Sequence, residues 1–283
     1  MGTEMQSLEQ GEVGQGAPPA PRAQRGDGRD GAADPRLDKR TYFNQIHRRW
    51  SIKGYDYGEG LCEIGWSYIR PPGGSKAERG KSDNRDAHEL RAIRRARSHL
   101  RRLVLSANAD HLLTLTYRDN ITDFDQASAD LARFIRRVKQ SLPEWVYIAV
   151  PERQQRGAWH WHLAVIGRQD VELLRASWQH VVGEGNIDVQ KPKSRIANQR
   201  LALVKYLGKY LAKGFEDGNR VLNGHRYRAS LGIQVPCKTI ELLPEFADDV
   251  PQYALDVLRA RAGSLGHVWN DDSGLMGWAC SWS

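Results

Sequence analysis

Two histidines separated by one residue, His160 and His162, stand in the apolar segment WHWHLAVI (159–166). The segment predicts a β-strand, and because side chains alternate across a strand, both imidazoles project from one face, about 7 Å apart. Two imidazoles on one exposed sheet face can bind a divalent ion and leave coordination positions open. Two half-buried sheet histidines without any ligand role are the alternative that this motif alone leaves open.

A carboxylate can complete such a metal site. Glu152 ends the preceding predicted strand, and a hairpin through RQQRGA would pair position 152 with position 160 and place both side chains on one face. A carboxylate beside two imidazoles favours Mg²⁺ or Mn²⁺ over a closed structural zinc site. A solvated glutamate at a strand end is the competing interpretation.

Two tyrosines recur at helical spacing in the downstream segment KYLGKYLAK. Tyr206 and Tyr210 are four residues apart, as are Lys205, Lys209 and Lys213, so two phenols lie along one helix face beside a row of lysines. A phenol has a pKa of about 10 and is a weak nucleophile at neutral pH. Neighbouring ammonium groups and a metal-polarised phosphodiester make attack on phosphorus feasible. An ordinary amphipathic helix is the structural alternative.

Hydrophobic periodicity predicts the elements that position these residues. Stripes of apolar residues predict helices at 85–104, 123–142, 171–182 and 197–213. Short runs of apolar and β-branched residues predict strands at 111–117, 145–152, 159–166 and 186–190. This order of elements predicts an α+β fold, with a central, mostly antiparallel sheet, helices packed on one face and the active site on the open face.

Composition divides the chain into four parts. Residues 1–37 are rich in Gly and Pro and contain no aromatic residue, which predicts a disordered arm. Aromatic residues mark 38–84 as an N-terminal extension that ends in a linker. Residues 85–240 hold the motifs described above, and 241–283 form an acidic C-terminal segment.

The net charge is concentrated in the middle of the chain. All 283 residues together carry 42 basic and 34 acidic side chains, a net charge of +8. Residues 39–240 alone hold 36 basic and 20 acidic side chains, because both ends of the chain are acidic. A surplus of this size predicts salt-dependent binding to nucleic acid. The candidate phosphate-contacting residues are all cationic: Arg91, Arg94, Arg95, Arg101, Lys205 and Lys213. A solvated arginine face is an equally open interpretation of the helix at 85–104.

Several function classes are disfavoured by missing motifs. There is no run of 18 apolar residues and no basic-then-apolar start, so neither a membrane span nor a secretory signal is expected. Cys62, Cys237 and Cys280 are far apart and odd in number, which suits a reducing cytosol. Because no GxxxxGK[ST] motif occurs, a P-loop ATPase is not expected.

The ordered segments LLTLTY (112–117), Ex₇HWH (152–162) and YLGKYLAK (206–213) resemble the HUH endonucleases. Within that superfamily they are most similar to the rolling-circle replication initiators, or Rep proteins, of bacterial plasmids and single-stranded DNA phages. The segment HRYRASLGIQVP (225–236) also looks like the stretch that follows the catalytic helix of the family. The similarity extends over about residues 85–236 and implies an HUH or RRM-like fold.

The resemblance also implies roles for particular residues. His160 and His162 match the metal ligands, with Glu152 as the expected third ligand to Mg²⁺ or Mn²⁺. Tyr206 and Tyr210 match the paired nucleophiles of the two-tyrosine branch. The LLTLTY strand carries no ligand and is expected to support the site as its central strand.

The same resemblance also implies roles for two lysines. Lys209 matches the lysine between the tyrosines, which stabilises a phosphate or the leaving oxygen. Lys213 is a less specific match.

The implied enzyme is a rolling-circle replication initiator, a site-specific DNA endonuclease and strand transferase. It would nick and join single-stranded DNA at a replication origin through a 5′-phosphotyrosine and free a 3′-hydroxyl primer. The implied partners are single-stranded or supercoiled origin DNA and the host helicase and replication machinery, in the cytoplasm of a bacterial host and without a membrane.

Other interpretations of the same chemistry differ in recognisable ways. Relaxases carry a three-histidine cluster and an N-terminal nucleophile, and HUH transposases usually have one tyrosine, so the pattern in this chain disfavours both. A catalytically silent DNA-binding protein on the same sheet is disfavoured by the intact ligand and tyrosine positions.

Overall fold

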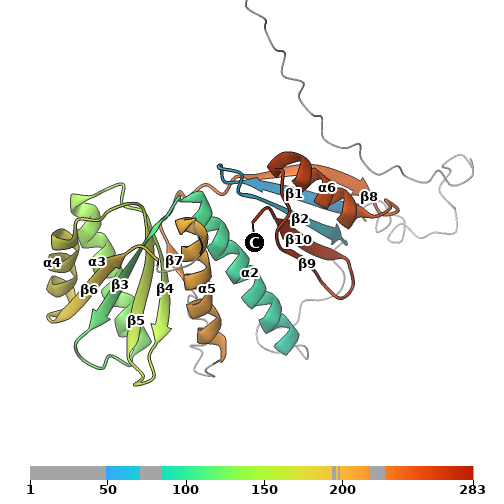
Figure 1. Ribbon diagram of the computed structural model, residues 1–283. Helices are drawn as coiled ribbons and strands as arrows, with labels where there is room; N and C mark the ends of the chain where they lie inside the picture. The colour runs from blue at the N-terminus through green and yellow to red at the C-terminus, as the bar shows by residue number, and fades with distance from the viewer. Residues whose placement is uncertain (1–48, 71–84, 193–195, 197, 217–226, 283) are drawn as a thin grey trace, which may run out of the picture. The chain divides into compact units, whose positions relative to one another are not determined.

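The computed structural model describes residues 49–70, 85–192, 196, 198–216 and 227–282 (Figure 1). It divides into two units: unit 1, residues 1–75 with 236–283, and unit 2, residues 76–235. A five-stranded antiparallel sheet forms the framework of each unit. The expected disordered arm, 1–37, lies outside the described residues.

The sheet of unit 2 has the strand order β6-β3-β5-β4-β7. Its strands are β3 (His111–Tyr117), β4 (Tyr147–Arg153), β5 (Trp159–Val165), β6 (Gly185–Gln190) and β7 (Arg228–Ala229). β4 and β5 form the expected hairpin, and Glu152 pairs with His160 in its register. The strand that carries both histidines, β5, is therefore the middle strand of the sheet.

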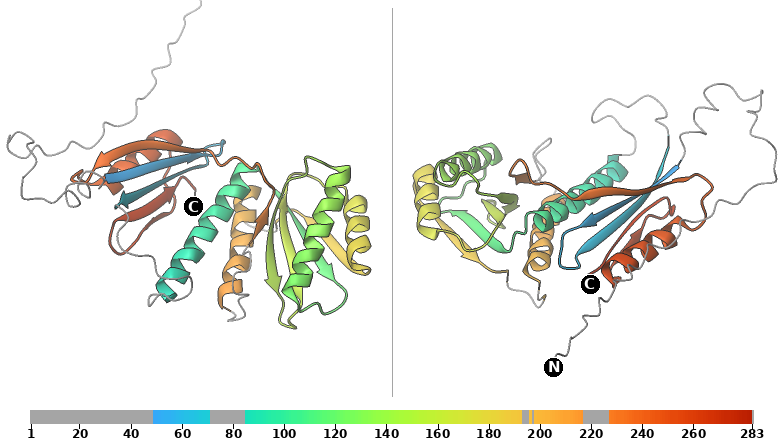
Figure 2. Two further views of the ribbon diagram at one scale, coloured as in Figure 1. Left: turned by 180° about the vertical axis from the view of Figure 1, so that it is seen from behind. Right: turned by 90° about the horizontal axis from the view of Figure 1, so that it is seen from above.

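Helices cover both faces of this sheet (Figures 1 and 2). They are α2 (Arg85–Ser106), α3 (Phe124–Ser141), α4 (Val171–Val182) and α5 (Gln199–Glu216). One face packs against α3 and α4, and the other, through Ile148, Val150 and Ala164, packs against α2 and α5. The α+β class is confirmed, but the histidine face is not open, because its apolar residues are withdrawn from water by α2 and α5.

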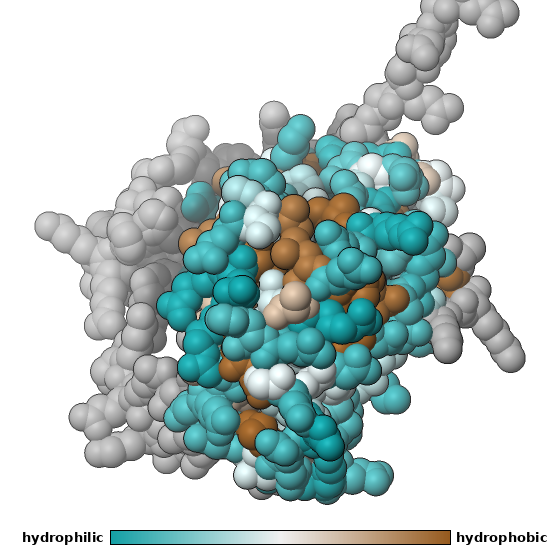
Figure 3. Space-filling model, turned by 90° about the vertical axis from the view of Figure 1, so that its left-hand side faces the viewer, coloured by the Kyte–Doolittle hydropathy of each residue, from teal (hydrophilic) through white to brown (hydrophobic). Residues whose placement is uncertain are grey.

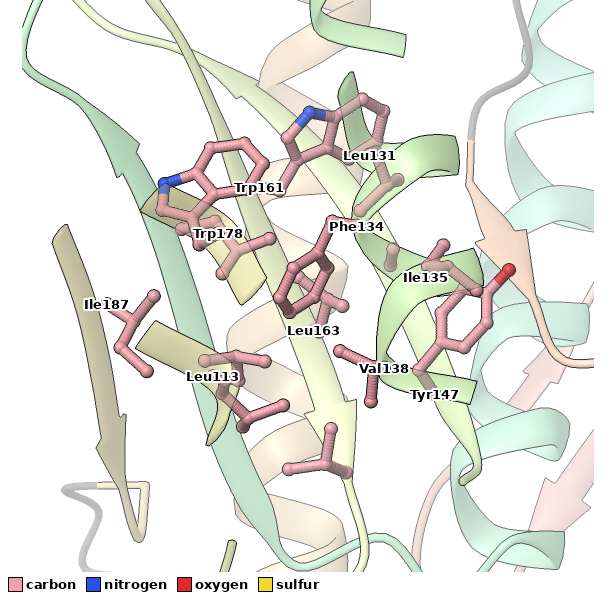
Figure 4. Close-up of a cluster of buried hydrophobic side chains, with 14 of the residues drawn as sticks. Leu113, Leu131, Phe134, Ile135, Val138, Tyr147, Trp161, Leu163, Trp178 and Ile187 are labelled. Carbon is pink, nitrogen blue, oxygen red and sulfur yellow. The ribbon is translucent and has the colours of Figure 1, made fainter. Parts of the chain in front are cut away.

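The amphipathic pattern of α3 explains how the first face is built. Asp123 caps the helix by accepting a hydrogen bond of 2.8 Å from the backbone N–H of Asp125. The buried residues recur at intervals of three or four: Ala127, Leu131, Phe134, Ile135 and Val138. Phe134 lies among side chains of the helices and of the sheet (Figure 4), and its ring centroid is 5.7 Å from that of Trp178. Truncating such a buried ring to alanine costs about 3–5 kcal/mol.

The sheet of unit 1 joins segments from both ends of the sequence. Its strands, in the order β8-β1-β2-β10-β9, are β1 (Arg49–Asp56), β2 (Cys62–Ile69), β8 (Cys237–Pro244), β9 (Val268–Asn270) and β10 (Met276–Cys280). Helix α6 (Val250–Ala262) packs on one face of this sheet, where Val257 and Leu258 join a core with Ile52, Ile64 and Trp66. The segments 38–84 and 241–283, treated separately in the sequence analysis, thus contribute strands to one sheet.

None of the helices in the described part of the chain is both long enough and apolar enough to cross a membrane.

Candidate active site

Strand β5 and helix α5 bring the two principal motifs together on one face of the unit 2 sheet. The ring of His162 stacks on that of Tyr210, with centroids 4.2 Å apart and planes inclined by 23°. Tyr206 meets the same imidazole edge-on at 5.7 Å. The expected helical spacing of the tyrosines therefore places both phenols against one histidine.

The two phenols also contact each other. The hydroxyl of Tyr210 donates a hydrogen bond of 3.0 Å to that of Tyr206. Burial raises the pKa of Tyr210 above its ordinary value, and the hydrogen bond to Tyr206 and the negative charge of Glu152 raise it further. Tyr210 is therefore held in its protonated form.

Glu152, at the end of β4, lies between a histidine and a lysine. Its Oε2 is 2.7 Å from Nε2 of His162, and its Oε1 accepts a hydrogen bond of 3.0 Å from Nζ of Lys213. Burial opposes ionisation, but the hydrogen bonds from His162 and Lys213 outweigh it, so the pKa of Glu152 lies below its usual range. The site therefore contains an ionised, largely buried carboxylate.

A threonine supports His162 from the neighbouring strand. Thr114 lies opposite His162 in the pairing of β3 with β5, and its Oγ1 is 3.3 Å from Nδ1 of the imidazole. The LLTLTY motif predicts only a general supporting role for this strand and does not by itself single out Thr114. The signal that points to it is positional, because Thr114 is a polar side chain at the register position that faces His162.

His160 is the least satisfied polar group of the site. It is 8% exposed, and its buried Nε2 has no hydrogen-bond partner among the residues that the structure describes. Burial and the neighbouring His162 lower the pKa of His160, so the imidazole is neutral at pH 7. A neutral imidazole with an unpartnered nitrogen is the form in which histidine ligates a metal ion.

The donor atoms suit a metal, although they are not assembled around one position. Within the described residues, no group of three or more His, Cys, Asp and Glu side chains is arranged to hold a metal ion. Glu152 uses both oxygens on His162 and Lys213. The imidazole and carboxylate set of His160, His162 and Glu152 fits Mg²⁺ or Mn²⁺, and the unpartnered His160 nitrogen agrees with a ligand role. Metal binding by these three residues stays a prediction.

One expectation about the histidines is corrected by burial. They were expected on an exposed face, but His160 and His162 are 8% and 4% exposed. His162 is buried because the rings of Tyr206 and Tyr210, on α5, pack against it.

The cationic candidates fall into different environments. Lys205 and Lys209 are exposed, and Nζ of Lys209 lies 6.0 Å from the ring centroid of Tyr210. Lys213 is instead bound to Glu152. The candidate arginines lie on α2, which packs against α5: Arg91, Arg94 and Arg95 are exposed and Arg101 is half-buried.

The segment that carries this site also matches a known family. Residues 110–215 match the family model for replication-associated protein ORF2/G2P. The matched range extends from the start of β3 into the last turn of α5 and contains Glu152, both histidines and both tyrosines. The match supports a replication initiator.

The chain was also compared with curated proteins and with solved structures. No curated protein matches the sequence. The crystal structure of the hypothetical protein ORF119 from Sulfolobus islandicus rod-shaped virus 1 is similar over 45% of this chain and 97% of that chain, with 12% sequence identity and a TM-score of 0.29.

Proposed function

We propose that this protein initiates rolling-circle DNA replication by nicking and rejoining one strand at an origin through a covalent phosphotyrosine. The observation that carries the proposal is the contact of two phenols, 3.0 Å apart at their hydroxyls, with His162. The match of the surrounding segment to a replication-associated family supports the same function.

The nicking step is an exchange of phosphodiester bonds. A tyrosine oxygen forms a bond to phosphorus, and the bond between phosphorus and the 3′ oxygen breaks. The phenolic proton passes to solvent, and the departing 3′ oxygen takes up a proton to become a hydroxyl. The products are a 5′-phosphotyrosine and a free 3′-hydroxyl. The hydroxyl primes synthesis by the host replication machinery, while a host helicase unwinds the duplex. No net hydrolysis occurs, so the bond energy is retained for rejoining.

The residues around the phenols have distinct tasks in this step. His160, His162 and Glu152 would hold Mg²⁺ or Mn²⁺, which when bound polarises the scissile phosphodiester as a Lewis acid. Lys209, exposed beside Tyr210, is placed to neutralise charge on a phosphate or on the leaving oxygen.

The second tyrosine gives the site a way to finish the reaction. While one phenol stays esterified to the 5′ end, the other can cut the regenerated origin after a full round of synthesis. The freed 3′-hydroxyl then attacks the first phosphotyrosine, which releases that tyrosine and closes the circle. Both phenols lie on one face of α5, so both can serve one scissile position.

The decisive experiment looks for the covalent intermediate. Full-length protein is incubated with single-stranded oligonucleotides from its own replicon and Mn²⁺, and protein–DNA adducts are separated under denaturing conditions. We expect an adduct that disappears with chelator, with His160→Ala, and with Tyr206→Phe and Tyr210→Phe combined. Tyr253→Phe is the matched control, because it removes a hydroxyl that is hydrogen-bonded to Glu241 in unit 1. An adduct that persists in the double variant would disprove the nucleophile assignment.

A further inference from the structure

A cationic groove lies between α3 and α4. These helices cover the sheet face opposite the one on which α5 places its tyrosines. It has a volume of about 330 Å³, and its lining is mainly polar: Arg133, Arg136, Arg137, Gln140, His180 and Val181. Figure 3 looks onto the side of the chain on which α3 and α4 lie, where hydrophilic residues surround a band of hydrophobic ones. The family match and the chemistry proposed above give this groove no role.

The spacing of the α3 residues explains why their cations converge. Positions 133, 136, 137 and 140 follow the i, i+3, i+4, i+7 pattern, so they form one stripe along the helix. The stripe adjoins the buried one that includes Phe134 and Val138 and anchors α3 to the sheet. Since the buried residues hold the helix in place, the cationic stripe is presented on a rigid element.

Two of the three arginines are available for an external ligand. Arg133 is paired with Asp130, whose side chain is 3% exposed. Arg136 and Arg137 are exposed, and neither makes a hydrogen bond or ion pair with any residue in the part of the chain that the structure describes. Arg133 lies three and four residues from Arg136 and Arg137, and like charges at this spacing on a helix destabilise it slightly. An anion that neutralises them would relieve this repulsion.

We infer that this groove binds the phosphate backbone of duplex DNA. Arginine pairs with phosphate through two parallel N–H···O bonds, and Gln140 and His180 can add further hydrogen bonds to phosphate oxygens. Among the described residues, no Phe, Tyr or Trp lines the groove. Sites for single strands usually combine cations with aromatic platforms for unpaired bases, whereas contacts to a duplex backbone need only the cations. The contact is therefore independent of base sequence.

The choice of DNA as the polyanion rests on the proposed function. An origin offers an unpaired strand at the nick and paired DNA beside it. The tyrosine face would act on the unpaired strand, while the groove on the other face would hold the neighbouring duplex. Binding at the groove would then keep the enzyme on the circle independently of the covalent bond.

The test measures binding without catalysis. Full-length protein with Arg136→Gln and Arg137→Gln is titrated with a fluorescent duplex and with the corresponding single strand, in chelator and at several salt concentrations. We expect duplex affinity at about 0.1 M salt to fall about tenfold or more, and the slope of log K against log salt to fall by about 2. Binding of the single strand should change less than twofold. Arg136→Lys with Arg137→Lys should retain most of the affinity, because both charges remain.

A charge-matched variant decides whether the groove itself matters. Lys139→Gln with Arg175→Gln removes two cations from the same two helices at positions that do not line the groove. An equal loss of duplex affinity in this control, or an unchanged affinity in the groove variant, would overturn the inference. A loss confined to the single strand would overturn it as well. Because these titrations need no nicking, failure to form a phosphotyrosine would contradict the proposed function and leave the duplex result standing.

Discussion

The Tyr210 hydroxyl donates its hydrogen bond to the Tyr206 hydroxyl, at 3.0 Å, so two chemically identical groups occupy unequal positions. Tyr210 stacks on His162 and lies close to the carboxylate of Glu152, and its pKa is raised by burial, by the hydrogen bond to Tyr206 and by that carboxylate. Tyr206 accepts the hydrogen bond and meets the His162 ring edge-on instead of stacking on it. This asymmetry predicts that the two phenols have different roles in the reaction.

Tyr206 is expected to make the first cut. Tyr206→Phe should slow formation of the first phosphotyrosine by at least about 100-fold, because the remaining Tyr210 must lose its proton against burial and a nearby carboxylate. Tyr210→Phe should slow it only about tenfold but prevent strand joining. The measurement is the rate of adduct formation and of oligonucleotide joining for each single variant. A normal first cut in Tyr206→Phe would show that the order is reversed.

The contacts of Glu152 predict that replacing Glu152 destabilises the protein more than replacing Lys213 does. Glu152→Gln removes the charge that His162 and Lys213 both bind, and should lower the free energy of unfolding by about 1–3 kcal/mol. Lys213→Met should cost less than about 1 kcal/mol, because the Lys213 side chain is 36% exposed. Urea unfolding in chelator measures both. Equal costs would contradict the view that the carboxylate is the centre of this network.

Asp110 gives unit 2 a predictable dependence on pH. Its Oδ1 accepts a hydrogen bond of 2.6 Å from the backbone N–H of Gly167 and lies 2.9 Å from Nδ1 of His111. Burial opposes ionisation, but the hydrogen bonds from His111 and Gly167 outweigh it, so the pKa of Asp110 is lowered on folding. A lowered pKa contributes stability above the unfolded value of about 3.9, and this contribution is lost as pH falls through the folded value.

Asp110→Asn should therefore unfold at a lower urea concentration than the wild type at pH 7. The difference between the two proteins should shrink at pH 3, where the wild-type carboxyl is also becoming protonated. A difference that stays constant from pH 7 to pH 3 would show that the charge of Asp110 contributes nothing.

Two glycines of unit 2 should respond in opposite directions to replacement by alanine. A Cβ at Gly208, within α5, would meet nothing within 4 Å, so Gly208→Ala should stabilise the protein by about 0.5–1 kcal/mol. A Cβ at Gly185 would lie 2.6 Å from Nε1 of Trp178 and 2.7 Å from the carbonyl oxygen of Thr116. Gly185→Ala should cost about 1–3 kcal/mol, since it forces apart a buried ring and a backbone. Thermal unfolding of the two variants side by side checks both signs.

Local pattern was enough to predict most of unit 2. The strand at 111–117 and the helix at 171–182 were predicted with the bounds that the structure has, and the pairing of position 152 with position 160 is confirmed. These elements have strong periodicity or are joined by a short hairpin, so neighbouring residues specify them. The site forms because α5 packs its tyrosines against His162 on β5. No local sequence pattern predicts that contact.

The parts that could not be predicted depend on distant partners. β8 pairs with β1 through contacts such as Trp50 with Leu243, which are 193 residues apart in the sequence. Its sequence, CKTIELLP, alternates only weakly, and nothing in it identifies β1 as its neighbour. Helix α6 did carry a local signal, with Asp249 as its N-cap and Gly263 after its last turn.

The sheet of unit 1 also has a consequence for biosynthesis. The ribosome completes β2 at Ile69 but does not reach β8 until Cys237, a delay of about 8–34 s at about 5–20 residues per second. Throughout this interval the β1–β2 hairpin lacks the strands that later flank it, and an isolated hairpin is at best marginally stable. All of unit 2 is synthesised in the meantime. The sheet of unit 1 can be completed only after β10 has been translated, so a product that ends before β8 would carry the tyrosines and histidines without that sheet.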